Sequence, residues 1–186
     1  LGHIGYLELE DAFTLQAAGL IDGGVDAILI ETAPDPLQIK AAINGAKIAR
    51  VGANFDTPIL VQATIETTGA ILVGADISAV ATAIEAMDVD SLGLNCATGP
   101  QEMAEHVRWL TDHWPKHISV QPNAGLPELV DGQTKYPLGP KEITRWLERF
   151  AFEDGVSMIG GCCGTTGPHS ESRDAMLRSH ANGELR

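Results

Sequence analysis

Three cysteines, the only ones in this 186-residue chain, are the residues best able to do chemistry. Cys162 and Cys163 are adjacent and bracketed by glycines in the stretch 160–164, and Cys96 ends a separate apolar run. Neighbouring side chains of a strand point to opposite faces, so both sulfurs of the pair can reach one object only where the backbone leaves the strand conformation. Glycine permits that departure. We therefore predict that turns at two strand ends bring the three thiols into one site.

The spacing of these thiols predicts a zinc site built by a preformed fold. Cys96 and Cys162 are 162 − 96 = 66 residues apart, far from zinc-finger spacing. Three thiolates around Zn²⁺ leave a net charge of −1. A zinc centre with this charge activates bound water poorly but can accept a fourth thiolate ligand. A substrate thiol at such a centre is deprotonated near neutral pH and stays nucleophilic. The predicted reaction is the transfer of an alkyl group to a thiol.

Other interpretations of these residues stay open at the level of sequence. A lone buried cysteine such as Cys96 is commonly an inert apolar residue, and the Cys162–Cys163 pair could form a vicinal disulfide in a redox protein. Glu31 follows a predicted strand and is either a solvated loop carboxylate or a partner for a substrate ammonium group. The six histidines are predicted to be surface residues rather than ligands: His3, His106, His113, His117, His169 and His180.

Strand and helix patterns alternate along the chain, which predicts the α/β class with a parallel sheet. Apolar runs predict strands over residues 25–30, 58–65, 91–95, 117–121 and 156–159. Helices are predicted over residues 9–21, 37–51, 76–87, 100–114 and 141–150, with an irregular loop over 122–140. The chain has no Gly-x-Gly-x-x-Gly motif and no P-loop, which disfavours a nucleotide-binding fold.

Polar residues follow one predicted strand after another, as they do at the C-terminal rim of a TIM-type (β/α)8 barrel. A closed barrel needs eight strands and roughly 250 residues. The sequence shows only about five β/α units and starts without an initiator methionine. We therefore expect a partial barrel whose first strands are missing and whose sheet has two unpaired edges.

The charge balance bears on partners and location. Lys and Arg total 12 against 25 Asp and Glu, a formal net charge of −13, and no basic stripe is present. Nucleic acid and anionic membranes are therefore poor partners. No apolar run approaches the ~20 residues of a membrane span, and the start of the chain lacks a signal-peptide pattern. A cytoplasmic protein without a disulfide framework is expected.

Two segments resemble the signatures of the homocysteine S-methyltransferase family: Gly-Gly-Cys-Cys-Gly-Thr-Thr over 160–166 and Leu-Asn-Cys-Ala-Thr-Gly-Pro over 94–100. Further similarity points to the homocysteine-binding module of cobalamin-dependent methionine synthases. It lies in Leu-Ile-Glu-Thr at 29–32, Thr-Ile-Glu-Thr-Thr-Gly at 64–69 and Gln-Pro-Asn-Ala-Gly-Leu-Pro at 121–127. The resemblance covers nearly the whole chain up to Thr166.

The resemblance implies that zinc activates the thiol of homocysteine for methyl transfer, forming methionine. It assigns the zinc ligands to Cys96, Cys162 and Cys163. Glu31 matches the carboxylate that holds the substrate amino group, and Asn95 and Asn123 are expected to contact substrate. Asn123 also matches a residue that can serve as an exchangeable fourth ligand. Methylcobalamin and methyltetrahydrofolate are implied on other modules or partner proteins.

The chain also departs from the family pattern. It lacks the family's opening Asp-Gly-Ala-Met-Gly-Thr-like segment, and it reads Gly-Pro-His at 167–169 where the family usually has Pro-Glu-His. We therefore expect a homocysteine-binding domain over residues 1–166, the C-terminal part of a barrel, followed by a polar tail over 167–186. Two alternatives remain: a truncated, catalytically incompetent zinc-binding homologue, and a methyltransferase that uses betaine or S-methylmethionine.

Overall fold

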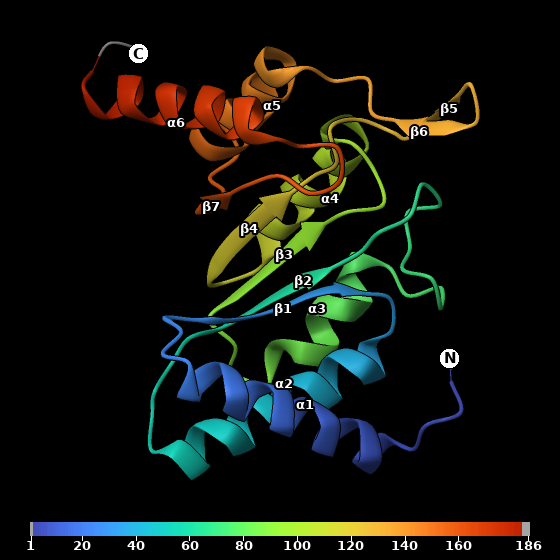
Figure 1. Cartoon of the computed structure of the whole chain (residues 1–186), viewed down its shortest axis with the longest axis vertical. Helices are drawn as coiled ribbons and strands as arrows, with labels where there is room; N and C mark the ends of the chain where they lie inside the picture. Colours follow the sequence, from blue (N-terminus) through green and yellow to red (C-terminus); the bar gives the residue numbers. More distant parts are fainter. Residues whose placement is uncertain (1, 184–186) are drawn as a thin grey trace.

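A five-stranded parallel sheet forms the centre of the computed structural model, which describes residues 2–183 (Figure 1). The strand order is β1-β2-β3-β4-β7, so strands that follow one another in this sheet are also neighbours in space. The α/β class and the parallel sheet predicted from the sequence are confirmed. The strands are β1 (Ile28–Ala33), β2 (Ile59–Ala63), β3 (Ser91–Asn95), β4 (His117–Gln121) and β7 (Met158–Ile159).

Strand β1 begins and ends three residues later than the predicted range 25–30. The pairing of β1 with β2 shifts between Ile30 and Ala33, and Thr32 adopts a left-handed φ of 52°. This conformation is uncommon for a β-branched residue. The irregularity places Glu31 inside the strand, where the sequence pattern predicted a loop.

Six helices accompany the sheet within residues 2–183. Two of them begin at aspartates that accept hydrogen bonds from the first turn: Asp35 from the amide of Leu37 at 2.8 Å, and Asp76 from the amide of Ala79 at 2.8 Å. Such caps satisfy amides that have no partner within the helix. The helices are α1 (Tyr6–Asp22), α2 (Pro36–Ala53), α3 (Ile77–Glu85), α4 (Pro100–His113), α5 (Pro140–Phe152) and α6 (Gly167–Ala181).

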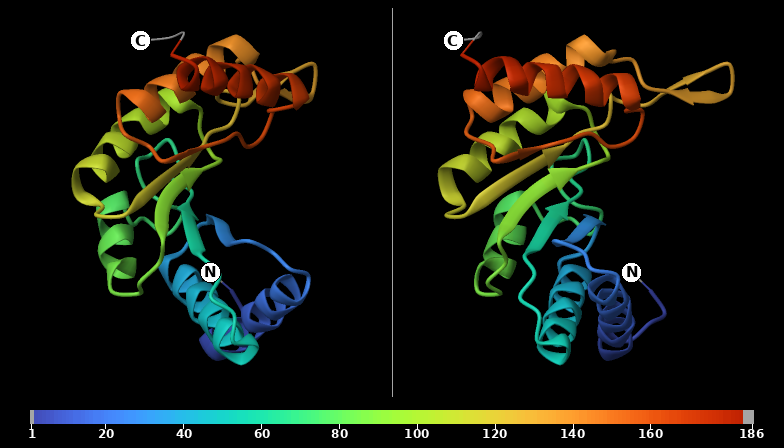
Figure 2. Two further views of the ribbon diagram at one scale, coloured as in Figure 1. Left: turned by 90° about the vertical axis from the view of Figure 1, so that its left-hand side faces the viewer. Right: turned by 60° about the vertical axis from the view of Figure 1, so that its left-hand side comes forward.

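The helices form an arc around one face of the curved sheet and leave the other face open (Figure 2). Apolar strand residues pack against the helices and form the core, among them Val61, Leu94 and Val120, all fully buried. The alternate residues Gln62, Gly93 and Ser119 lie side by side on the inner face. Gln62 Nε2 donates to Ser119 Oγ at 3.0 Å across Gly93, and a Cβ at Gly93 would overlap Ser119.

Both edges of the sheet are open within residues 2–183. Strand β1 pairs only with β2, and the short strand β7 pairs only with β4. Unpaired edge strands expose backbone donors and acceptors that another strand can satisfy. In this part of the chain no helix is both long enough and apolar enough to cross a membrane.

The segment 122–140, predicted to be irregular, contains a hairpin of β5 (Glu128–Val130) and β6 (Gln133–Lys135) that projects from the body (Figure 1). Its turn is Asp131-Gly132, and both residues have positive φ, 53° and 75°. Asp-Gly is a strong sequence indicator of a two-residue hairpin turn. The hydrophobic pattern did not predict this hairpin, because its two strands are only three residues long and mostly exposed.

Most of the polar segment 167–186 is helical. Helix α6 packs on α5, with Met176 buried and two polar contacts between the helices. Thr144 Oγ1 donates to Ser172 Oγ at 2.9 Å, and His180 Nε2 lies 2.7 Å from Glu148 Oε1. Because these contacts are largely polar, the helix has no apolar stripe that a periodicity argument could detect.

Candidate metal centre

Two turns at one end of the sheet bring the three thiols together. Cys96 follows β3, and Cys162 and Cys163 follow β7; β4 lies between these two strands. Cys163 Sγ lies 3.8 Å from Cys96 Sγ and 3.9 Å from Cys162 Sγ, and all three sulfurs lie within 4.8 Å of one another. Cys96 and Ala97 both have left-handed φ values, 60° and 55°. The backbone therefore leaves the strand conformation where Cys96 turns into the cluster.

The sulfur separations fit a tetrahedral zinc ion. Zinc–thiolate bonds are about 2.3 Å long, so two sulfurs at corners of a regular tetrahedron are about 3.8 Å apart. Two of the sulfur–sulfur distances match that edge length. The third, between Cys96 Sγ and Cys162 Sγ, is at most 4.8 Å and would have to shorten by about 1 Å or less. Three sulfurs occupy three corners and leave the fourth open to another ligand. Among residues 2–183 this is the one group of three His, Cys, Asp or Glu side chains placed to hold a metal.

In the metal-free cluster the Cys162 thiol stays protonated. Burial, followed by the neighbouring Cys96 thiol, raises the pKa of Cys162 to about 12. Both effects disfavour the thiolate, since burial removes solvent and a second thiolate adds like charge. A bound dication would reverse this balance, because thiols that coordinate zinc lose their protons. Metal binding at this cluster is therefore expected to release protons.

The segment that follows β4 clamps the cysteine pair through three hydrogen bonds. The amide of Cys162 donates to the Pro122 carbonyl at 2.8 Å, and the amide of Cys163 donates to Asn123 Oδ1 at 3.0 Å. The amide of Ala124 donates to the Cys163 carbonyl at 2.9 Å. Asn123 is 3% exposed, so its side chain supports the turn from inside the protein. An amide oxygen has two lone pairs, so this contact leaves one free.

Asn95 connects the cysteine turn to Glu31. Its Nδ2 donates to Glu31 Oε2 at 2.7 Å and to Thr32 Oγ1 at 2.8 Å. Its Oδ1 accepts from the Thr32 amide at 3.0 Å and from Thr64 Oγ1 at 3.4 Å. Asn95 is fully buried and protein atoms occupy both ends of its amide. The network holds Glu31, which is exposed, by one carboxylate oxygen.

Tyr136 is a residue of this site that no sequence motif predicted. Burial, followed by a hydrogen bond to Cys163, raises the pKa of the Tyr136 hydroxyl. The ring covers Gly164, where φ is 80° and an added Cβ would overlap the ring atoms. Tyr136 lies just after the β5–β6 hairpin, in a segment of mixed polarity. Its sequence neighbours therefore gave no sign of a half-buried aromatic residue at the site.

His169, predicted to lie at the surface, ties this segment to α6. Its Nδ1 accepts from the Thr166 amide at 3.1 Å, and its Nε2 lies 3.2 Å from the Leu138 carbonyl. The first contact identifies Nδ1 as the acceptor, so Nε2 carries the proton and donates to Leu138. His169 lies in the segment predicted to be a polar tail, for which the sequence predicts no structural partner.

The sequence profile of the homocysteine S-methyltransferase family matches residues 1–172. This chain belongs to the homocysteine S-methyltransferase family. The match passes through the cysteine pair and continues into α6, beyond the position at which the resemblance was expected to stop. The family predicted from the two cysteine motifs is therefore confirmed.

Methionine synthases are among the relatives of this chain. It is 50% identical to the methionine synthase of Mycobacterium tuberculosis and 49% identical to that of Mycobacterium leprae, each over 169 residues. In both cases the match covers 91% of this chain and 14% of the relative. The chain thus spans about one seventh of the length of the methionine synthases it matches.

Solved structures of the family show the same fold. The chain resembles the homocysteine methyltransferase MmuM from Escherichia coli in its apo form, with a TM-score of 0.72, 19% identity, and coverage of 94% of this chain and 58% of MmuM. The metallated form gives a TM-score of 0.69, 20% identity, and coverage of 94% and 53%. At this identity the likeness concerns the fold alone.

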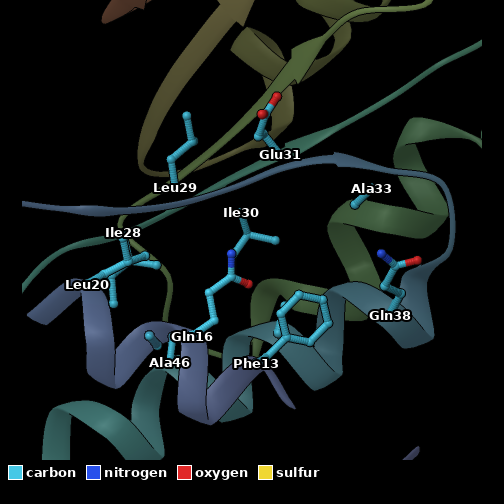
Figure 3. Close-up of a pocket in the computed structure, with 12 residues that line it drawn as sticks. Phe13, Gln16, Leu20, Ile28, Leu29, Ile30, Glu31, Ala33, Gln38 and Ala46 are labelled. Carbon is cyan, nitrogen blue, oxygen red and sulfur yellow. The ribbon is translucent and has the colours of Figure 1, made fainter. Parts of the chain in front are cut away.

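A cavity of about 280 Å³ lies elsewhere, between β1, α1 and α2 (Figure 3). Phe13, Leu20, Ile28 and Ile30 are among the residues that line it, and no cysteine does. Glu31 borders the cavity, but its side chain points away from the two helices, as Figure 3 shows. The cavity is therefore separate from the thiol cluster.

Proposed function

We propose that this chain is the homocysteine-activating module of a methionine synthase and that Cys96, Cys162 and Cys163 hold its zinc ion. The observation that carries the proposal is the pair of sulfur separations, 3.8 and 3.9 Å, which match the edge of a zinc–thiolate tetrahedron. The identity of about 50% to two methionine synthases favours this member of the family over betaine- or S-methylmethionine-dependent enzymes.

Zinc bound at this cluster would lower the pKa of the homocysteine thiol and supply a nucleophilic sulfur at neutral pH. The chain's own residues position the substrate. Glu31 is exposed and carries a negative charge that suits the substrate ammonium group. Asn95 orients Glu31, which is a supporting role rather than the direct substrate contact expected from the resemblance.

Asn123 has two proposed roles. Its amide oxygen accepts the Cys163 N–H and so fixes the cysteine turn. The second lone pair of that oxygen can supply a weak, exchangeable fourth ligand until substrate arrives. A neutral oxygen is a poorer ligand for zinc than a thiolate is, so the substrate sulfur would displace it readily.

The methyl donor must come from outside these residues. We assign methylcobalamin and methyltetrahydrofolate to other modules of the same protein or to a partner, consistent with the small share of the methionine synthases that this chain spans. We place the homocysteine-binding domain over residues 1–166, with α6 packed against it as a C-terminal extension. A cytoplasmic location stays a prediction.

We also propose that the five β/α units are part of a TIM-type (β/α)8 barrel. Further strands could pair with the exposed edges of β1 and β7. Residues of a further β/α unit beside β1 could then fill the cavity between β1, α1 and α2. If further β/α units are required for turnover, this chain alone binds zinc without forming methionine. That outcome corresponds to the alternative of a truncated, catalytically incompetent homologue.

Zinc content tests the proposal. We expect about one zinc per chain in the purified protein and loss of that zinc in Cys162→Ser, because two thiolates form an incomplete site. Ser170→Ala on the exposed part of α6 is the matched control and should keep its zinc. A folded wild-type chain that binds no zinc when supplied with it would overturn the proposal.

A further inference from the structure

Thr32 is held in a backbone conformation that threonine rarely adopts. Its φ is 52°, and among residues 2–183 it is the one β-branched residue with a positive φ. A branched side chain in this left-handed region is strained. The pairing of β1 with β2 is irregular at the same point, between Ile30 and Ala33. Such strain persists only where surrounding contacts hold it, and the contacts of Thr32 are with Glu31 and Asn95.

The left-handed φ lets the side chains of two consecutive residues of β1 meet. On a regular strand the side chains of Glu31 and Thr32 would point to opposite faces of the sheet. Here Thr32 Oγ1 donates to Glu31 Oε2 at 2.8 Å. The same hydroxyl accepts from Asn95 Nδ2 at 2.8 Å, and the Thr32 amide donates to Asn95 Oδ1 at 3.0 Å. Thr32 therefore binds both members of the Glu31–Asn95 pair.

The hydrogen bonds to the Glu31 carboxylate end on the same oxygen. Oε2 accepts from Thr32 Oγ1 at 2.8 Å and from Asn95 Nδ2 at 2.7 Å. Among residues 2–183 no hydrogen bond or ion pair reaches the other oxygen, Oε1. Both donors are uncharged, so they hold the carboxylate without neutralising it. Glu31 is exposed and points away from α1 and α2 (Figure 3), so Oε1 is free to accept from the ammonium group of a ligand.

We propose that Thr32 is a positioning residue that sets the preference of this site for thiols that carry an ammonium group, an inference that rests on the proposed function of the cluster. Because Thr32 and Asn95 fix Oε2, Glu31 presents Oε1 in one orientation before the ligand arrives. Without the Thr32 hydroxyl, Glu31 must lose its rotational freedom on binding, which lowers affinity. A thiol without an ammonium group makes no ion pair with Glu31 and does not incur this loss.

The test compares two ligands on the full chain loaded with zinc: homocysteine and γ-mercaptobutyrate, which is homocysteine without its amino group. Calorimetric titration gives both dissociation constants, and their ratio measures the preference. We expect Thr32→Val, which keeps the branched shape but lacks the hydroxyl, to lower the preference for homocysteine about three- to tenfold, the effect of one side chain that is immobilised only on binding. Its affinity for γ-mercaptobutyrate should equal that of the wild type. Thr82→Val on the exposed side of α3 is the matched control and should leave the ratio unchanged.

A second pair of variants keeps the test decisive if valine disturbs the strained backbone. Thr32→Ala and Thr32→Ser both lack the methyl group and differ only in the hydroxyl. The serine variant should therefore show the wild-type preference, and the alanine variant the reduced one. The effect of Thr32→Val should also disappear in a Glu31→Gln background, because Thr32 acts through the charged carboxylate.

Zinc content and homocysteine binding of the wild type separate the two levels of inference. A wild-type chain that binds no zinc, or binds zinc but no homocysteine, overturns the proposed function. A wild type that prefers homocysteine, with the same preference in Thr32→Val and Thr32→Ala, overturns the role of Thr32 alone. Equal losses in Thr32→Ala and Thr32→Ser also overturn that role, because the methyl group rather than the hydroxyl would then matter.

Discussion

Asn95 Nδ2 donates a hydrogen bond of 2.7 Å to Glu31 Oε2, joining the carboxylate on β1 to the residue that precedes Cys96 on β3. Strand β2 lies between these two strands. The contact is possible because Thr32 leaves the regular strand conformation and directs its own amide to Asn95 Oδ1. The buried side chain of Asn95 thus links Glu31, the proposed ammonium site, to the turn that carries Cys96.

Asn95→Ala should weaken homocysteine binding while zinc stays bound. The substitution frees Glu31 to rotate into solvent and removes a buried amide, at a cost of about 2 kcal/mol in the free energy of unfolding. Calorimetric titration with homocysteine measures the affinity, and urea unfolding measures the stability. Glu31→Gln is the companion variant, since it keeps the size and the hydrogen bonding but not the charge. Homocysteine affinity equal to wild type in both variants would remove Glu31 and Asn95 from the site.

The metal-free chain should lose stability as the pH rises above about 9. The pKa of Cys162 is raised from 9.0 to about 12 in the folded protein. Below pH 9 this thiol is protonated in both states, so its contribution is fully present. Between pH 9 and pH 12 the unfolded chain releases the proton and the folded chain retains it, which favours unfolding.

Thermal unfolding at pH 8 and pH 10.5, with EDTA and with zinc, measures this effect. The midpoint should fall between the two pH values more steeply in EDTA than in zinc, because bound metal keeps the thiols ionised at both. Cys162→Ser in EDTA is the control and should show a smaller fall than wild type. Equal slopes for wild type and Cys162→Ser would show that this thiol does not ionise as expected.

Gly164→Ala should destabilise the chain by about 2 kcal/mol or more. The position combines a φ of 80° with a Tyr136 ring that leaves no room for a Cβ. Gly52→Ala on α2 is the matched control, since a Cβ there meets nothing within 4 Å and alanine favours the helix. Chemical denaturation of both variants makes the comparison. A Gly164→Ala chain as stable as wild type would mean that Tyr136 moves aside easily.

Asn123→Ala should lower zinc affinity by roughly ten- to a hundredfold, as losses of residues that support metal ligands commonly do. The Cys163 amide loses its acceptor, so the turn that presents two of the sulfurs gains freedom. Competition with a chromophoric chelator gives the affinity. Asn182→Ala at the end of α6 serves as control. An unchanged affinity in Asn123→Ala would exclude both the supporting role and the ligand role.

The elements around the site could be predicted well where local patterns were strong. Continuous apolar runs identified the five parallel strands, because most of these strands contribute buried apolar residues to the core beneath the helices. The exposed β5–β6 hairpin and helix α6 were missed for the opposite reason. Their residues face solvent or make polar contacts such as that between His180 and Glu148, and so they carry no hydrophobic period.

The sequence by itself determined the family and predicted a zinc site, since adjacent cysteines among glycines demand a turn and three thiols favour zinc. Only the tertiary structure decided which residues support them. Asn95 contacts Glu31 because β1, β2 and β3 pair in parallel. Tyr136 contacts Gly164 because the loop that carries Tyr136 returns to the site. Side-chain contacts between residues so distant along the chain depend on strand register and loop path, and neither is encoded in the pattern of nearby residues.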